Sequence, residues 1–177
     1  MAKALIVVDM QNDFVKGHMS TPEALGTVAV IREKLERSRA DGDWVVFTAD
    51  THLDEEYGAA APAAEAALLP KHCIRGTAGW QIIDELRPYA DEVFEKPTFL
   101  GLGLEERLAG RISDTPGDVI ELCGVCTDIC VLSNALYLRA KYPRARIVVD
   151  QRACAGVTPA AHEAALTAMR SCLVQVL

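Results

Sequence analysis

The sequence predicts an α/β protein built on a three-layer, doubly wound, six-stranded parallel sheet with helices on both faces. Short apolar runs rich in β-branched residues alternate over the whole length with stretches whose apolar residues recur every three or four positions. The 177 residues suit one domain, and no Pro/Gly/Ser-rich linker divides them. Residues 1–177 are therefore expected to form a single domain.

Six runs have the length and apolar content of strands. They lie at residues 4–8, 44–48, 92–96, 118–124, 146–150 and 172–177. Runs that are apolar on both faces are typical of parallel strands covered by helices on each side. Right-handed crossovers between such strands place helices on both faces of the sheet.

The stretches between these strands have helical spacing. They lie at residues 22–40, 79–90, 103–110, 127–142 and 158–171. Thr127 and Thr158 suit N-cap positions, and Pro159 suits the first turn of the last helix. Residues 50–78 interrupt the pattern, because a connection of this length exceeds the usual βα loop. Its Ala-rich centre predicts one short helix after Pro62, and a long loop at a strand's carboxyl end is a common place for a site.

Composition excludes several classes of protein. The net charge of -7 and the lack of Lys/Arg clusters argue against nucleic-acid binding. The apolar run near the N-terminus is short and ends at Asp9, so it resembles neither a secretory signal nor a membrane span. We expect a cytoplasmic protein whose six cysteines are reduced thiols.

Candidate catalytic residues follow from the fold, because ligands of open parallel sheets bind outside the carboxyl ends of the strands. The residues at these ends are Asp9, Asp50, His52, Lys96 and the segment from Cys126 to Cys130. Cys130 lies in the first turn of a predicted helix, where the helix dipole is expected to lower the pKa of a thiol. A carboxylate can accept the thiol proton and a lysine can hold the resulting charge, so Asp9, Lys96 and Cys130 are expected to form a catalytic set.

The stretch CGVCTDIC, residues 123–130, is open to other interpretations. A zinc site would need two more thiols or histidines nearby, and the sequence does not place them there. Cys123 ends an apolar strand and is expected to be a packed thiol, with redox pairing to Cys126 as the minor alternative.

Four ordered motifs together resemble the isochorismatase-like cysteine hydrolases, the superfamily that contains the nicotinamidases. The motifs are VDMQNDF at 8–14, FTADTH at 47–52, HCIRGTAG at 72–79 and GVCTDICV at 124–131. The resemblance spans almost the whole chain and implies a strand order of 3-2-1-4-5-6. Its catalytic triad falls on Asp9, Lys96 and Cys130, in agreement with the strand-end analysis. Lys96 must reach across two strand spacings of about 4.8 Å each.

The resemblance also implies details of the site. A cis peptide is expected between Val125 and Cys126, with the backbone amides of Cys126 and Cys130 forming an oxyanion hole. We expect Phe14, Val125 and Leu69 to contribute to substrate binding, with Phe14 stacking on one face of a pyridine ring.

A metal site is expected in the long loop. Asp50 and His52 point the same way if the strand geometry continues, and the resemblance adds His72 and Glu65. Two carboxylates and two imidazoles suit a divalent metal, with zinc favoured and manganese or iron as alternatives. His18 and His162 lack such a context and are expected to have no chemical role.

The resemblance implies amide hydrolysis through a thioester, and the metal residues favour nicotinamide as the substrate. Two departures concern the pocket wall: Leu69 stands where nicotinamidases often carry Trp, and the segment after Lys96 lacks their usual aromatic, Ser and Gly-Thr pattern. The alternatives are a hydrolase of another small amide or carbamoyl compound and a non-catalytic metal-binding or interaction module. A homo-oligomer is implied by the family.

Overall fold

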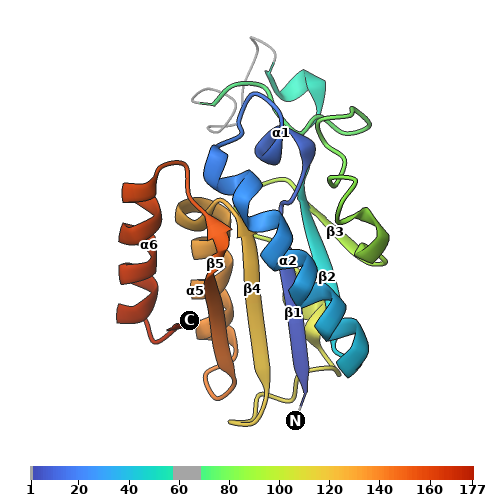
Figure 1. Ribbon diagram of the computed structural model, residues 1–177. Helices are drawn as coiled ribbons and strands as arrows, with labels where there is room; N and C mark the ends of the chain where they lie inside the picture. Colours follow the sequence, from blue (N-terminus) through green and yellow to red (C-terminus); the bar gives the residue numbers. More distant parts are fainter. Residues whose placement is uncertain (1, 58–68) are drawn as a thin grey trace.

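The computed structural model describes residues 2–57 and 69–177. Its six strands form one sheet in the order β3-β2-β1-β4-β5-β6, with every neighbouring pair parallel. The strands are β1 (Lys3–Val8), β2 (Trp44–Asp50), β3 (Val93–Lys96), β4 (Val119–Val125), β5 (Arg146–Ala155) and β6 (Gln175–Val176). This confirms the predicted α/β class and strand order. The carboxyl ends of the long strands meet at the upper edge of the sheet in Figure 1.

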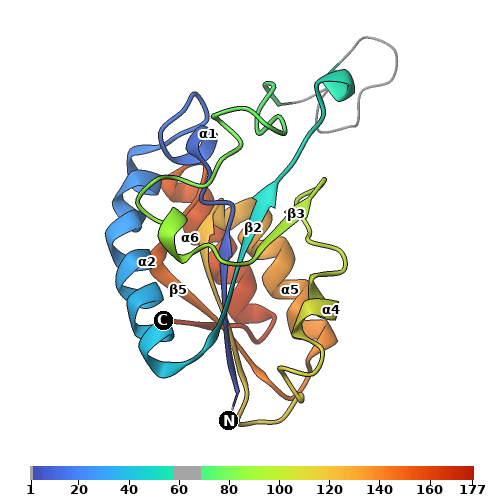
Figure 2. The same cartoon turned by 90° about the vertical axis from the view of Figure 1, so that its right-hand side faces the viewer.

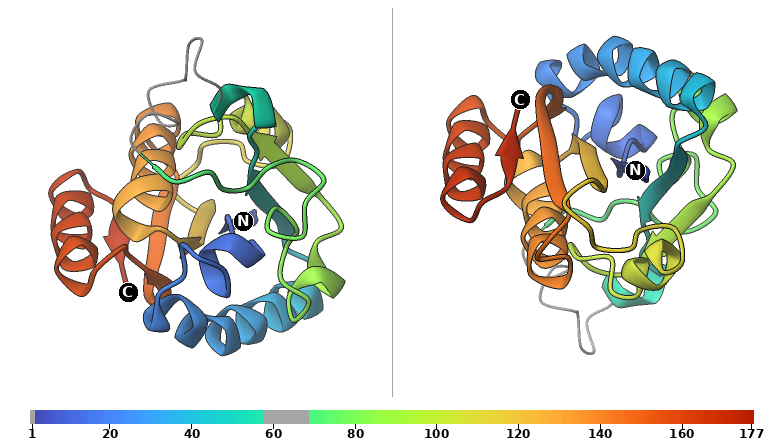
Figure 3. Two further views of the ribbon diagram at one scale, coloured as in Figure 1. Left: turned by 90° about the horizontal axis from the view of Figure 1, so that it is seen from above. Right: turned by 90° about the horizontal axis from the view of Figure 1, so that it is seen from below.

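Helices cover both faces of this sheet. They are α1 (Asn12–Val15), α2 (Pro22–Asp41), α4 (Leu104–Leu108), α5 (Leu132–Lys141) and α6 (Pro159–Ser171), with short helical turns at Asp54–Tyr57, Arg87–Tyr89 and Thr127–Val131. Figures 2 and 3 show α2 on one face and α5 on the other. The last helix, α6, packs against α5 and β6. Within the described ranges no helix combines the length and hydropathy needed to cross a membrane.

The two central strands approach each other closely immediately before the residues of the site. Ala4 to Val8 of β1 are all buried, and Val8 pairs in register with Gly124 of β4. Gly124 has a φ of 115°, and a Cβ built there would lie 2.1 Å from the carbonyl oxygen of Val8. Only glycine fits this close approach, which sets Asp9 and Cys126 on adjacent backbones.

The prediction of a helix over residues 79–90 is wrong. The backbone of this segment pairs with the residues that follow β1: Gln11 forms a bridge with Ile82, and the Ile83 amide donates to the Met10 carbonyl at 3.0 Å. An amide that bonds a distant carbonyl is not available to an α-helix. Pro88 follows, and only the turn at Arg87–Tyr89 is helical.

The predicted helix over residues 127–142 has an unexpected beginning. Residues Thr127–Val131 form a π-helical turn whose N-cap is Cys126, and α5 starts only at Leu132. The Thr127 hydroxyl bonds His162 Nδ1 at 2.8 Å, so the prediction that Thr127 is the N-cap is wrong. Thr158 is confirmed as an N-cap, because its hydroxyl accepts from the Ala161 amide at 3.1 Å.

A buried ion cluster fastens α2 to the sheet. The Lys34 ammonium lies 2.7 Å from Glu121 Oε1 on β4 and 2.6 Å from Asp150 Oδ2 on β5. Both acids are buried in the sheet. Charges at such positions need partners, because removing one from water costs several kcal/mol.

Candidate active site and metal centre

Three side chains from separate strand ends meet above the centre of the sheet. Asp9 follows β1, Lys96 ends β3 and Cys130 lies in the π-helical turn after β4. The Lys96 Nζ lies 2.7 Å from Asp9 Oδ2 and 3.6 Å from Cys130 Sγ. Asp9 and Lys96 have no exposed surface, and Cys130 is 5% exposed. The structure thus brings together the three residues that the sequence predicts as a catalytic set.

The position of Lys96 follows from strand register. Lys96 pairs with Asp50 across β3 and β2, and its ammonium lies 3.1 Å from Asp50 Oδ1. It also donates to the carbonyl of Thr98 at 3.1 Å. Burial lowers the pKa of Lys96, but the negative charges of Asp9, Cys130 and Asp50 outweigh burial and raise it. These neighbours therefore favour the charged ammonium form of Lys96.

Burial of the Cys130 side chain favours the protonated form of its thiol. Burial is the largest cause that raises its pKa well above the usual value, and the charge of Asp9 adds to this effect. The prediction that the helix N-terminus lowers this pKa is wrong, because burial removes the sulfur from water and disfavours the thiolate. Burial also raises the pKa of Asp9, although Lys96 opposes the rise.

Thr48 is a site residue that sequence reasoning missed. Its hydroxyl donates to Asp9 Oδ1 at 2.6 Å, and the Asp9 amide donates to the Thr48 carbonyl at 3.2 Å. Asp9 has a positive φ of 50°, so these bonds fix a backbone conformation that few residues adopt. The signal lay in the alternation of β2, because Thr48 stands two residues before Asp50 on the same side of the strand.

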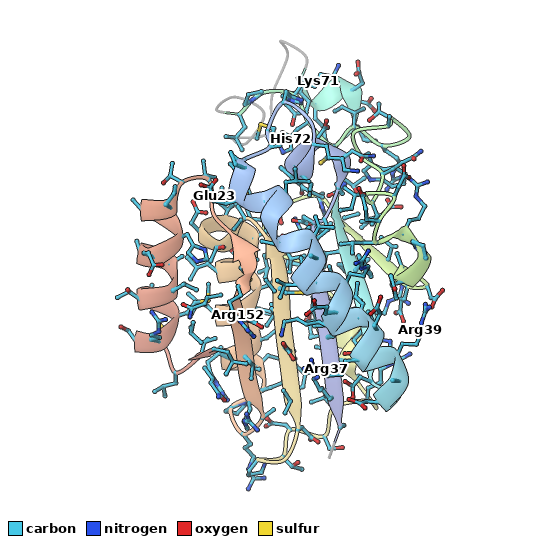
Figure 4. The ribbon with its side chains drawn as sticks, viewed as in Figure 1. Glu23, Arg37, Arg39, Lys71, His72 and Arg152 are labelled. Atoms are coloured by element: carbon cyan, nitrogen blue, oxygen red, sulfur yellow. The ribbon has the colours of Figure 1, made fainter. Side chains whose placement is uncertain are left out.

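Asp50, His52 and His72 form a buried group that fits a metal ion. One donor atom from each lies within 4.8 Å of the others. Asp50 Oδ2 lies 3.1 Å from His52 Nε2 and 3.3 Å from His72 Nε2. Figure 4 shows His72 above the carboxyl ends of the strands. Two imidazole nitrogens and one carboxylate oxygen suit zinc and other first-row divalent metals.

Each of the two imidazole rings has an oxygen atom near its Nδ1 nitrogen. Glu56 Oε2 lies 3.4 Å from His52 Nδ1, and the Pro70 carbonyl lies 2.7 Å from His72 Nδ1. Such partners are typical of metal-binding histidines, because they fix the ring orientation and direct Nε2 toward the ion. Glu65, the other predicted ligand, and the helix expected after Pro62 lie outside the described residues.

A cavity of about 290 Å³ opens onto both groups. Its walls include Phe14, Leu69, Phe99, His72, Cys126 and Cys130. Phe14 and Leu69, two of the residues expected to bind substrate, thus line this cavity. Val125 is buried at the end of β4, and its side chain is not among those that line the cavity. Another cavity, of about 400 Å³, is lined by Trp44, Tyr89 and Arg111 and contains none of the candidate residues.

Phe99 is the second site residue that sequence reasoning missed. It lies in the segment after Lys96, whose pattern differs from that of nicotinamidases, and it nevertheless supplies an aromatic ring to the cavity wall. The only available signal was its position three residues after Lys96 at a strand end.

The Val125–Cys126 peptide is cis, as the resemblance implies. Cys126 is half-buried and lines the cavity together with Cys130. Cys123 is fully buried in β4, and burial raises the pKa of its thiol, which agrees with a packed residue. All six cysteines lie in the described ranges, and each is a free thiol. Of the remaining histidines, His18 bonds the Lys71 carbonyl at 3.0 Å at the side of the cavity.

Residues 3–177 match the family model described as the isochorismatase domain. The chain belongs to the isochorismatase family. Among the relatives of this family member is the nicotinamidase/pyrazinamidase of Mycobacterium tuberculosis, 30% identical over 185 residues, with 99% of this chain and 98% of the relative covered.

Solved structures of the isochorismatase family have the same fold. The nicotinamidase PncA from Bacillus subtilis is 32% identical, with a TM-score of 0.84 and 99% of each chain covered. The pyrazinamidase of Pyrococcus horikoshii in complex with zinc is 26% identical, with a TM-score of 0.82, 100% of this chain covered and 99% of the other.

Proposed function

We propose that the protein is a cysteine-dependent amidohydrolase that converts nicotinamide to nicotinate and ammonia. The similarity to nicotinamidases over nearly the full chain supports hydrolysis of a linear amide. The observation that carries the proposal is the meeting of Asp9, Lys96 and Cys130 in one buried group at a mostly apolar cavity. A thiol beside a carboxylate base is the arrangement that nucleophilic catalysis requires.

Acylation begins at the Cys130 thiol. Asp9 removes its proton as the sulfur attacks the amide carbonyl, and the raised pKa of Asp9 makes it a better base than an ordinary aspartate. The negative oxygen that forms is stabilised by the backbone amides of Cys126 and Cys130. Asp9 then gives its proton to the departing nitrogen, which leaves as ammonia, and a thioester remains on Cys130.

Deacylation reverses these roles. Asp9 takes a proton from a water molecule, the resulting hydroxide attacks the thioester carbonyl, and the Cys130 sulfur leaves with the proton held by Asp9. The product is a carboxylic acid. Throughout both halves Lys96 offsets the negative charge that moves between Asp9 and Cys130, because its ammonium is within 4 Å of both.

Asp50, His52 and His72 would hold a divalent metal, for which we propose zinc. A bound metal would supply a Lewis-acid contact for the ring nitrogen of the substrate, beside the carboxamide that Cys130 attacks. The chemistry of these donors does not separate zinc from manganese or iron.

The proposal is tested by ammonia release from the purified, zinc-supplemented protein with nicotinamide, pyrazinamide and a carbamoyl amide as substrates. We expect nicotinamide turnover that Cys130→Ala abolishes. The matched control is Cys172→Ala, because Cys172 is an exposed thiol and is not among the residues that line the cavity.

The outcomes separate the alternatives. Preference for the carbamoyl amide would identify a hydrolase of another small compound, an alternative that the altered wall at Leu69 keeps open. No turnover of any amide, with an unreactive Cys130, would identify a non-catalytic metal-binding or interaction module. A cytoplasmic location and a homo-oligomer stay predictions.

A further inference from the structure

A buried amide side chain joins the helix of the nucleophile to the segment that follows β3. Asn134, in the first turn of α5, is 1% exposed. Its Nδ2 donates to the Cys130 carbonyl at 2.8 Å and to the Phe99 carbonyl at 3.0 Å, and its Oδ1 accepts from the Gly101 amide at 3.1 Å. Both donors of the amide are therefore used, and its oxygen has a partner.

The segment that Asn134 holds has no regular secondary structure, so side-chain bonds decide its path. At its start, the Lys96 ammonium donates to the Thr98 carbonyl at 3.1 Å. At its end, a Cβ built on Gly101 would lie 3.3 Å from Asn134 Oδ1, so a side chain there would crowd the amide. The segment is thus fixed between the lysine of the triad and the helix of the nucleophile.

Phe99 is the residue that this arrangement presents to the cavity. It is 37% exposed and lines the same cavity as Phe14 and Cys130. An apolar ligand that covers this partly exposed ring removes apolar surface from water, which favours binding. A cavity of about 150 Å³ holds benzene. The cavity here, of about 290 Å³, has room for a six-membered ring with its amide beside these phenylalanines.

We propose that Asn134 is a positioning residue for Phe99 and that the contact of the Phe99 ring with a planar substrate depends on it. This inference deepens the proposed function and rests on it. Asn134 acts without touching substrate: it ties the backbone of the cavity wall to the backbone of the nucleophile, so the ring and the sulfur keep a constant separation.

The test measures binding by calorimetry in a Cys130→Ala background, in which no turnover occurs, with nicotinamide and isobutyramide as probes. We expect Phe99→Leu to weaken nicotinamide binding roughly 3- to 10-fold, the range of one aromatic contact, and to leave isobutyramide binding within about 2-fold. Tyr89→Leu is the matched control, because Tyr89 lines the other cavity and is not among the residues that line this one. It should leave both affinities unchanged.

A double-mutant cycle separates positioning from general stability. Asn134→Ala should reproduce the loss of nicotinamide binding, and in combination with Phe99→Leu it should add almost nothing. Independent, additive losses would overturn the role of Asn134. If Asn134→Ala does not fold, Gly101→Ala replaces it, since the added methyl group crowds the amide and should shift the same ratio of affinities.

The binding measurements test this inference, and the activity measurements test the proposed function. If nicotinamide does not bind to the parent protein, or if Phe99→Leu leaves its affinity unchanged, the inference is wrong whatever the enzyme hydrolyses. If no amide releases ammonia while the affinities change as expected, the proposed function is wrong and the inference about Asn134 and Phe99 stands.

Discussion

The ammonium of Lys96 lies 2.7 Å from the carboxylate of Asp9, although β2 stands between the strands that carry them. Both side chains have no exposed surface. Each therefore depends on the other for its charge, because an unpaired charge is costly at such a position.

Substitution of Lys96 by Met should reduce kcat by at least about 100-fold, the lower range for loss of a group that supports acid–base catalysis. The reason is that Asp9 and Asp50 both lose the cation that they share. Steady-state kinetics with nicotinamide measure the effect. Lys71→Met is the control, because Lys71 is exposed. Activity retained in Lys96→Met would contradict the role of the ammonium.

The pH dependence of kcat/KM should reflect the raised pKa of Asp9. Asp9 must be deprotonated to act as a base, so activity is present above its pKa and is lost as pH falls through it. Because burial raises this pKa above 3.8, the acid limb should lie above the usual range of an aspartate. A pH profile at constant ionic strength measures the acid limb. An acid limb centred at or below pH 3.8 would show that Asp9 is not the base.

Substitution of His72 by Ala should remove metal binding. Wild-type protein at a zinc concentration of about 100 times the Kd should be stabilised by about 2.7 kcal/mol relative to the metal-free protein, and His72→Ala should lose this gain. Thermal unfolding with and without zinc measures it, together with metal content. His18→Ala is the control, because His18 also lines the cavity but is not in the ligand group. Equal zinc stabilisation in all three proteins would place the metal elsewhere.

The ion cluster beneath α2 should contribute to stability rather than catalysis. Lys34→Met leaves Glu121 and Asp150 without their shared cation and should lower the free energy of unfolding by about 3 kcal/mol, the low end for a broken buried pair. Burial raises the pKa of Asp150, but its bonds to Arg152 and Lys34 outweigh burial and lower it. The stability from Asp150 is therefore present above its unfolded pKa of about 3.9 and is lost as pH falls through the lower folded value.

Urea unfolding of both proteins at pH 7 and at lower pH measures this contribution. The difference between wild type and Lys34→Met should be full at pH 7 and should shrink below about pH 4. Exposed Lys141→Met supplies the control. A difference that does not depend on pH would assign the effect to packing of the lysine stem.

The sequence predicted the parallel sheet and the three residues that meet at its edge, because these depend on local periodicity and on the residue types at the carboxyl end of each strand. The strand order was implied by the resemblance to the isochorismatase-like hydrolases, not by periodicity. It did not predict the irregular backbone at residues 79–90, since the Ile83 amide bonds a residue more than seventy positions earlier and helical spacing alone cannot reveal this. The same limit explains Thr48, Phe99 and Asn134, whose roles arise from contacts between distant segments.

The direction of the pKa shift of the Cys130 thiol could not be predicted from the sequence for a different reason. Position in a first helical turn suggests a low pKa, but desolvation depends on how completely other segments cover the sulfur. In the folded chain this cover is nearly complete, and it reverses the direction of the shift for Cys130.

Asp50 divides its carboxylate between two tasks: Oδ1 accepts from Lys96, and Oδ2 lies beside both histidines. A change at this one side chain will therefore disturb ion capture and nucleophile chemistry at once. Variants of Asp50 cannot assign a lost activity to one of these causes, whereas His52 and Lys96, each on one side of the carboxylate, can be changed to examine them in turn.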